Sequence, residues 1–142
     1  MQLKINRSKC TGCRICTTYC SFHHEGRIWP NMARIRIEAE TDSGPFSPQA
    51  CRQCNARRAS EGDLAPCAEA CPVEVIALDE RTGAWVIDTA ECTGCRSCEE
   101  ACPFGMIVFD RERELAFKCD LCVGEPECAA MCPSGAIELR IG

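Results

Sequence analysis

The chain has few aromatic residues and no long apolar run. Only 6% of its 142 residues are Phe, Trp or Tyr, a small share for a domain that must close a core with side chains alone. No apolar stretch reaches the roughly 18 residues that a membrane span needs, so we expect no membrane insertion. The amino-terminal MQLKINRSKC lacks the apolar segment and the cleavage site of a signal peptide. We therefore expect a cytoplasmic location.

Signatures of catalysis and of nucleotide binding are also absent from the sequence. It contains no glycine-rich phosphate loop and no nucleophile constellation, so we expect no catalytic activity of its own. The formal net charge is −5, whereas domains that bind nucleic acid carry a basic excess. Nucleic acid is accordingly not expected as a partner.

Cysteine, by contrast, is abundant and regularly spaced, with sixteen residues in four groups of four. The first and third groups follow the spacing CxxCxxCxxxC and comprise Cys10, Cys13, Cys16 and Cys20, and Cys92, Cys95, Cys98 and Cys102. The second and fourth groups have insertions only between their second and third members and comprise Cys51, Cys54, Cys67 and Cys71, and Cys119, Cys122, Cys128 and Cys132. This spacing is typical of ligands for [4Fe–4S] clusters.

The geometry of a cubane cluster explains the spacing. Three cysteines at i, i+3 and i+6 can surround one cubane in a tight loop, while the fourth ligates a different cluster, so such groups work in pairs. Three closing cysteines, Cys71, Cys102 and Cys132, precede proline, which fixes φ and favours an extended conformation before it. Cys20 precedes Ser21 instead. Four groups of four ligands predict four [4Fe–4S] clusters.

Other uses of cysteine fit the pattern less well. A disulfide scaffold would be expected in a secreted protein. Structural zinc uses paired CxxC units but does not need a third cysteine at i+6 or a proline after the fourth. A redox CxxC or a catalytic thiol would leave most of the cysteines without a role. Because ligation supplies folding free energy in small metal-binding domains, we expect the apo chain to be largely unfolded.

The segments between the cysteines predict short strands and single helical turns, and hence an α+β fold. Turn residues flanked by β-forming residues predict hairpins after the second and third groups. The expected strands are 2–5, 33–38, 75–78, 84–87, 106–109, 115–117 and one within 136–141; the expected helical turns are 17–21, 68–71, 97–101 and 129–132.

Pairing of the first and last strands would bring the two ends of the chain together. We therefore predict two nested bacterial-ferredoxin-like modules, each binding two clusters. Residues 1–50 and 110–142 would form an outer module with groups one and four, and residues 51–109 an inserted module with groups two and three. The loop at residues 41–48 is then a module connection or a partner-docking surface.

Over nearly its whole length the chain resembles the four-cluster iron-sulfur subunits of the dimethyl sulfoxide reductase and formate dehydrogenase type. In that family groups one and four exchange their last cysteines, as do groups two and three. The resemblance implies four ligand sets: set 1 (Cys10, Cys13, Cys16, Cys132), set 2 (Cys51, Cys54, Cys67, Cys102), set 3 (Cys71, Cys92, Cys95, Cys98) and set 4 (Cys20, Cys119, Cys122, Cys128). No cysteine is replaced by the tryptophan that marks a three-iron site in some relatives.

A narrower resemblance lies in residues 20–35, CSFHHEGRIWPNMARI. This segment is similar to compact ferredoxin-like subunits that accompany tungsten aldehyde oxidoreductases and class II benzoyl-CoA reductases, enzymes of anaerobic metabolism. It implies an electron-transfer subunit that connects a catalytic subunit with a pterin-bound metal to a redox partner such as a flavin subunit. The alternatives are a freestanding polyferredoxin shuttle, or a subunit of a molybdenum enzyme or hydrogenase. The sequence leaves the choice of tungsten or molybdenum, and any self-association, open.

Some residues outside the cysteine groups could act on a cluster. His23 and His24 follow a ligand closely and could tune a cluster or carry protons, although a solvated or interface role is the simpler interpretation. Lys118 precedes Cys119 and could either raise the potential of a cluster or form an ordinary salt bridge. Arg57 and Arg58 are expected on an exposed loop.

Overall fold

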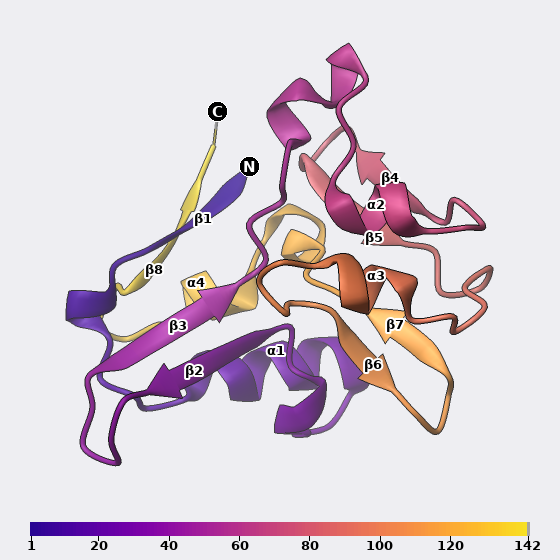
Figure 1. Ribbon diagram of the computed structural model, residues 1–142. Coiled ribbons are helices and arrows are strands. Elements are labelled where there is room, and N and C mark those ends of the chain that lie inside the picture. Colours follow the sequence, from indigo (N-terminus) through magenta and orange to yellow (C-terminus); the bar gives the residue numbers. More distant parts are fainter. Residues whose placement is uncertain (142) are drawn as a thin grey trace.

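The computed structural model describes residues 1–141 and shows short strands and short helices (Figure 1). Its strands are β1 (Gln2–Ile5), β2 (Ile35–Ala39), β3 (Phe46–Ala50), β4 (Ile76–Asp79), β5 (Ala84–Ile87), β6 (Val108–Asp110), β7 (Leu115–Phe117) and β8 (Ile137–Arg140). Its α-helices are α1 (Ile15–Glu25), α2 (Pro66–Ala70), α3 (Ser97–Ala101) and α4 (Glu127–Ala130), and 3₁₀ turns occur at Arg7–Lys9, Pro30–Met32, Ala56–Glu61 and Leu121–Gly124. Gly142, the last residue of the predicted outer module, lies outside the described residues.

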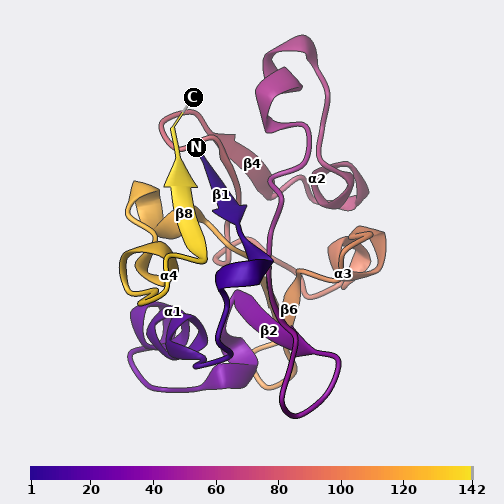
Figure 2. The ribbon, with the colours of Figure 1, turned by 90° about the vertical axis from the view of Figure 1, so that its left-hand side faces the viewer.

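The strands pair into four two-stranded antiparallel sheets within residues 1–141. Three sheets are hairpins of consecutive strands, whereas the fourth joins the two ends of the chain, with Leu3 opposite Leu139 and Ile5 opposite Ile137. Figures 1 and 2 show β1 and β8 side by side. The predicted pairing of the first and last strands is therefore confirmed. The nested arrangement of two modules stays a prediction.

Helices α2 and α3 end at Cys-Pro pairs, whereas α1 does not. α2 and α3 stop directly before Cys71 and Cys102, the closing cysteines that precede proline. α1 contains Cys20, which Ser21 follows, and it continues to Gly26, whose left-handed φ of 70° caps its end. The expected single turn at residues 17–21 is therefore wrong, because the chain meets no proline at that point and forms an 11-residue helix.

The segment expected to be a loop at residues 41–48 is in part a strand. β3 begins at Phe46 and pairs with β2 from Ile35 opposite Ala50 to Ala39 opposite Phe46. Pro48 is tolerated because each strand of a two-stranded sheet has one free edge. Residues 40–45 connect the two strands, so the segment comprises a hairpin turn and the start of β3. Its role as a module connection or a partner-docking surface stays a prediction.

The remaining elements lie close to their expected positions. Strands β1, β5 and β7 and helix α3 have the predicted bounds, and the other strands and helices are displaced by one to two residues, within the usual uncertainty of element ends.

The buried side chains form two cores that include many of the cysteines. One contains Cys67 of α2, Cys98 of α3, and Trp85 of β5. The other contains Cys16 and Cys20 of α1 with Cys128 of α4. The helices in these cores pack in pairs, α1 against α4 and α2 against α3. The cysteines therefore lie where a domain of this size would otherwise place large apolar side chains.

Candidate metal centres

The structure gathers cysteines from different groups around three cavities. Their linings contain Cys10, Cys13, Cys16 and Cys132 in the first, Cys51, Cys54, Cys67 and Cys102 in the second, and Cys71, Cys92, Cys95 and Cys98 in the third. In each cavity three cysteines come from one group and the fourth closes another group. These are the members of sets 1, 2 and 3, and their ligation of clusters stays a prediction.

The four cysteines of set 4 also lie close together. Burial raises the pKa of the Cys128 thiol, and charge on Cys119, Cys20 or Cys122 raises it further. Charge on Cys16 of set 1 also raises this pKa, so the effect shows that these thiols are electrostatic neighbours but does not separate set 4 from set 1. Within the described part of the chain, the structure brings sets 1, 2 and 3 together around cavities, and the grouping of set 4 stays a prediction.

Left-handed residues shape the loops of the first and third groups. Gly12 and Gly94 both have φ of 74°, and Arg14 and Arg96 have φ of 62° and 67°. Each arginine directly precedes a helix, α1 or α3. The chain therefore turns sharply around its first two cysteines before the helix presents the third to the same cavity.

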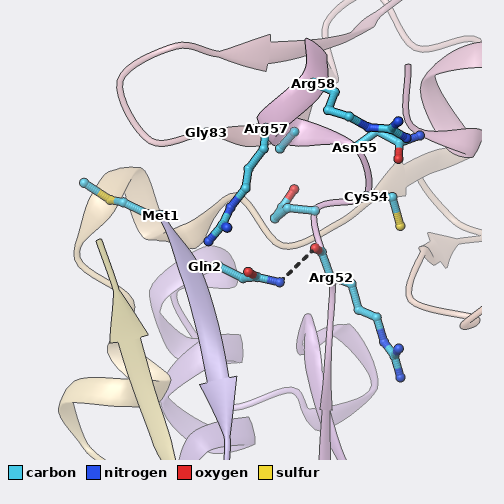
Figure 3. Close-up of a pocket in the computed structure, with 10 residues that line it drawn as sticks. Met1, Gln2, Arg52, Cys54, Asn55, Arg57, Arg58 and Gly83 are labelled. Carbon is cyan, nitrogen blue, oxygen red and sulfur yellow. Dashed lines mark hydrogen bonds between the residues drawn. The ribbon is translucent and has the colours of Figure 1, made fainter. Parts of the chain in front are cut away.

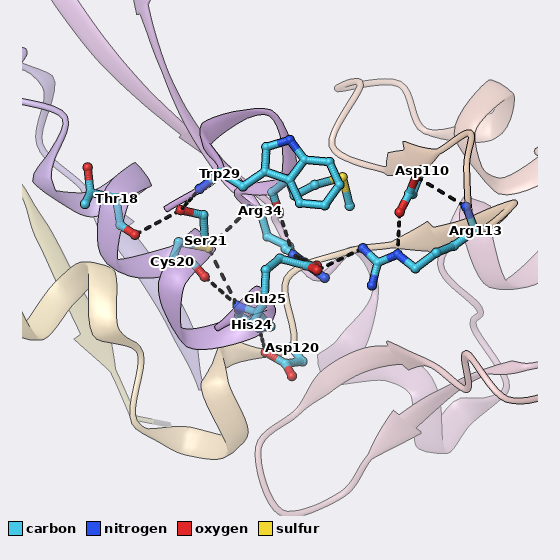
Figure 4. Close-up of polar contacts among 11 residues, drawn as sticks. Thr18, Cys20, Ser21, His24, Glu25, Trp29, Arg34, Asp110, Arg113 and Asp120 are labelled. Carbon is cyan, nitrogen blue, oxygen red and sulfur yellow. Dashed lines mark hydrogen bonds and ion pairs between the residues drawn. The ribbon is translucent and has the colours of Figure 1, made fainter. Parts of the chain in front are cut away.

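The four closing cysteines all have a hydrogen-bonding partner at sulfur. The Sγ of Cys20 accepts from the Arg34 amide at 3.1 Å (Figure 4), that of Cys71 from Val75 at 3.5 Å, and that of Cys102 from Met106 at 3.4 Å. Cys132 Sγ lies 3.6 Å from the Ser134 hydroxyl. Donors at sulfur stabilise thiolates and tune iron-sulfur potentials.

Without a metal the buried thiols would be neutral at pH 7. Burial raises the pKa of Cys16, Cys98 and Cys122 to about 11 and that of Cys119 to about 12. Metal ions bind thiolates and deprotonate coordinating thiols outright. Cluster binding must therefore release protons from these sites, which couples cluster affinity to pH.

His24 is half-buried, whereas a solvated or interface role was the simpler expectation. Its side chain is 13% exposed. Nδ1 lies 2.9 Å from the Cys20 carbonyl oxygen and Nε2 lies 3.0 Å from Asp120 Oδ1 (Figure 4). Burial lowers the pKa of His24, but Asp120 and Cys20 outweigh this effect and raise it to about 10. His24 is therefore a cation paired with Asp120 beside set 4, whereas His23 is 39% exposed.

Arginines line an open cleft next to Cys54 of set 2. Arg52, Arg57 and Arg58 line it together with the start of β1, where Gln2 donates a hydrogen bond to the Arg52 carbonyl at 3.5 Å (Figure 3). Arg57 and Arg58 are exposed, as expected, and Arg58 pairs with Asp63 at 3.1 Å. The cleft holds no group of cysteines and is not a fifth cluster site.

The donor chemistry of the three cavities fits iron-sulfur clusters. Each offers four cysteine sulfur atoms, and no Asp, Glu or His lines any of them. Thiolate donors without carboxylate or imidazole favour iron-sulfur clusters or zinc. Cysteines shared between groups are the arrangement of two-cluster ferredoxins.

Comparison with known proteins identifies the family. A family model described as a 4Fe-4S dicluster domain matches residues 43–141, and the chain belongs to this family. The sixteen cysteines fit four [4Fe–4S] clusters.

Relatives of the chain include subunits of oxidoreductases. It is 39% identical to the polyferredoxin-like subunit of aliphatic sulfonate oxidoreductase from Pyrococcus furiosus, over 90% of this chain and 69% of that protein. It is 36% identical to the putative electron transport protein YsaA of Escherichia coli, over 92% of this chain and 83% of that protein. A tetrathionate reductase subunit from Salmonella typhimurium is 28% identical, over 93% of this chain and 54% of that protein.

The helices were also compared with the length and hydrophobicity that a membrane span needs. Within residues 1–141, every helix is too short or too polar to cross a bilayer.

Proposed function

We propose that the chain is a non-catalytic electron-transfer subunit of an oxidoreductase, with one [4Fe–4S] cluster held by each of sets 1 to 4. A cluster of this type, when bound, takes up and releases one electron at a time. The observation that carries the proposal is the convergence of four cysteines on each of three cavities, every one combining two groups of the sequence. The protein's own residues hold the clusters, limit their contact with water and supply hydrogen bonds to sulfur.

Contacts between the sets support a linear order for the electron path. Cys16 of set 1 and Cys128 of set 4 share one core. Cys67 of set 2 and Cys98 of set 3 share the other. Cys119 of set 4 is close enough to Cys51 of set 2 for their charges to interact. We therefore order the sets 1, 4, 2 and 3 along the path.

Exposure of the cysteines agrees with this order. Among the sixteen only Cys13 and Cys95 are exposed, one in set 1 and the other in set 3. The two sets at the ends of the path thus each have one exposed ligand, while the cysteines of sets 4 and 2 are half-buried or buried. This distribution suits a path that exchanges electrons with partners at both ends and is better shielded from solvent between them.

The partners we propose are a catalytic subunit with a pterin-bound tungsten or molybdenum at one end and a redox subunit such as a flavoprotein at the other. Two relatives whose names make them subunits of oxidoreductases support a role inside a complex. The similarity of residues 20–35 to the partners of tungsten enzymes favours tungsten. We also propose two nested modules, in which residues 51–109 are inserted between residues 1–50 and 110–142. The packing of helix α1 against α4 and of α2 against α3 supports this arrangement, because each pair lies within one module.

Metal analysis of the protein purified anaerobically from its native host, with whatever remains bound, tests the proposal. We expect about sixteen irons per chain and one tungsten per complex. Molybdenum in place of tungsten would shift the assignment to a molybdenum enzyme, and iron alone, with no bound partner, would support a freestanding shuttle. Zinc without iron would contradict every version of the proposal.

A further inference from the structure

Lys118 differs from the other cations beside the cysteine sets. Its side chain is buried, with 6% of the residue exposed, and it lines the set 2 cavity. The cations at the other two cavities, Arg14 and Arg96, are exposed or bonded to a carboxylate: Arg14 is exposed, and Arg96 pairs with Glu99 at 2.7 Å.

Neutral oxygen atoms surround the Lys118 ammonium group. Nζ donates to Gln53 Oε1 at 3.1 Å, to the Cys119 carbonyl at 3.2 Å, and to the Trp85 carbonyl. Throughout residues 1–141 no carboxylate forms an ion pair with it. A buried charge without a partner is costly, and carbonyl dipoles solvate it without neutralising it. The plain salt bridge considered from the sequence is therefore wrong.

Gln53 holds the ammonium group in place. It lies between Cys51 and Cys54 of set 2 and has a left-handed φ of 48°. Its Oε1 also accepts from the Trp85 amide at 2.9 Å, and its Nε2 donates to the Cys119 carbonyl at 2.9 Å. One buried side chain thus joins the set 2 loop, strand β5 and the start of the fourth cysteine group around the cation.

The charge acts on the sulfur atoms of two sets. Burial raises the pKa of Cys54 and Cys67 in set 2 and of Cys119 in set 4, and Lys118 opposes this rise at all three. The cation therefore interacts with cysteines of both set 2 and set 4. These two sets are neighbours in the middle of the proposed electron path.

We propose that Lys118 is the buried countercharge of the cluster in set 2 and raises the reduction potential of that cluster. The inference rests on the proposed function, because it requires set 2 to hold a cluster. One electron arriving from a neighbouring cluster makes the site more negative by one charge, so a fixed cation stabilises the reduced form over the oxidised form. Water does not screen this effect, because the ammonium group is buried.

The test compares Lys118→Met with the native chain, both reconstituted with four clusters, by redox titration followed by electron paramagnetic resonance. We expect the midpoint potential of the set 2 cluster to fall, because Lys118 lines that cavity, and that of the set 4 cluster to fall less. At a fixed potential the ratio of reduced to oxidised cluster should drop roughly tenfold, which corresponds to about 59 mV for a one-electron couple. Lys118→Arg keeps the charge and should restore the native value.

Lys9 provides a matched control. It precedes Cys10 as Lys118 precedes Cys119, but it is exposed. Lys9→Met removes a charge at the same sequence distance from a ligand and should leave all four potentials unchanged, because solvent screens that charge.

A second variant covers the case in which Lys118→Met fails to load its clusters. Gln53→Glu keeps the ammonium group and places a carboxylate beside it, so it should lower the same potential. The inference is overturned if either variant carries full iron with all four potentials unchanged. A native chain that binds fewer than four clusters would instead contradict the proposed function itself, and iron content separates the two results.

Discussion

Gly12 and Gly94 occupy equivalent places in two cysteine loops but have different surroundings. Both have φ of 74°, so alanine at either costs about 1–2 kcal/mol in backbone strain. A Cβ at Gly94 would overlap the Glu114 carbonyl oxygen, which is backbone, whereas a Cβ at Gly12 would lie 2.7 Å from the Phe46 ring, which is a side chain. We expect Gly94→Ala to lose the set 3 cluster and Gly12→Ala to retain most of set 1, as measured by iron per chain.

Gly26→Ala serves as the control for strain alone, because its φ is 70° and nothing lies within 4 Å of the added Cβ. It should keep its full iron content. If Gly94→Ala also kept full iron, the packing of Glu114 against this loop would not matter for the site. Gly12→Ala combined with Phe46→Ala should recover any iron that Gly12→Ala loses.

Individual residues show where the sequence is least informative. The sets of cysteines that lie together could be inferred from spacing and from a family resemblance, since the spacing is set by the cluster. The half-buried position of His24 and the burial of Lys118 could not be inferred from the sequence. Each depends on partners distant in the chain: Asp120 for His24, and Gln53 and Trp85 for Lys118. Lys9 and Lys118 have the same sequence neighbour and opposite exposure.

At the scale of elements, the hairpins and short helices were predictable from turn residues and from Cys-Pro pairs. The length of α1 had a signal in the sequence, because Cys20 precedes a serine and not the proline that would end the helix. The strand from Phe46 had no such signal, because Pro48 argues against a strand unless the edge is known to be free.

Glu25, the last residue of α1, joins that helix to the β6–β7 hairpin. Its carboxylate accepts from Arg34 at 3.0 Å and from Arg113 at 2.9 Å (Figure 4), and its side chain is 7% exposed. Glu25→Gln would leave the buried Arg34 without its countercharge and should cost about 2 kcal/mol. We expect the apparent melting temperature of the holo protein at pH 7 to fall by about 6 °C.

The pH dependence of this loss follows from the pKa of Glu25. Burial raises it, but Arg113 and Arg34 outweigh burial and lower it below the ordinary 4.5. The ion pairs of Glu25 therefore contribute fully to the free energy of unfolding above pH 4.5. This contribution is lost as the pH falls through the lowered pKa that Glu25 has in the folded protein. The difference between native and Glu25→Gln should therefore stay constant from pH 8 to about 5. Glu40→Gln, at an exposed site, should leave the melting temperature unchanged, and an equal fall there would argue against the ion-pair explanation.

At the scale of the whole molecule, cysteines take the place of a conventional core. Three of the six buried members of one core are Cys16, Cys20 and Cys128, and two-stranded sheets are marginal on their own. Removing iron with a chelator under reducing conditions should therefore abolish most of the far-ultraviolet circular dichroism. Adding iron and sulfide back should restore it. An apo chain that kept its spectrum would show that the side chains alone specify the fold.

The exposure of Cys13 and Cys95 has a consequence for survival in air. Oxidants attack exposed thiolates first. Oxidative damage should therefore begin at the clusters of sets 1 and 3 and reach those of sets 4 and 2 later. A molecule damaged in this way would still be brown and still contain iron. Without its two terminal clusters it could still hold electrons on the inner pair but could not exchange them with partners. The brown colour of an aerated sample would therefore overstate the fraction of protein that is active in electron transfer.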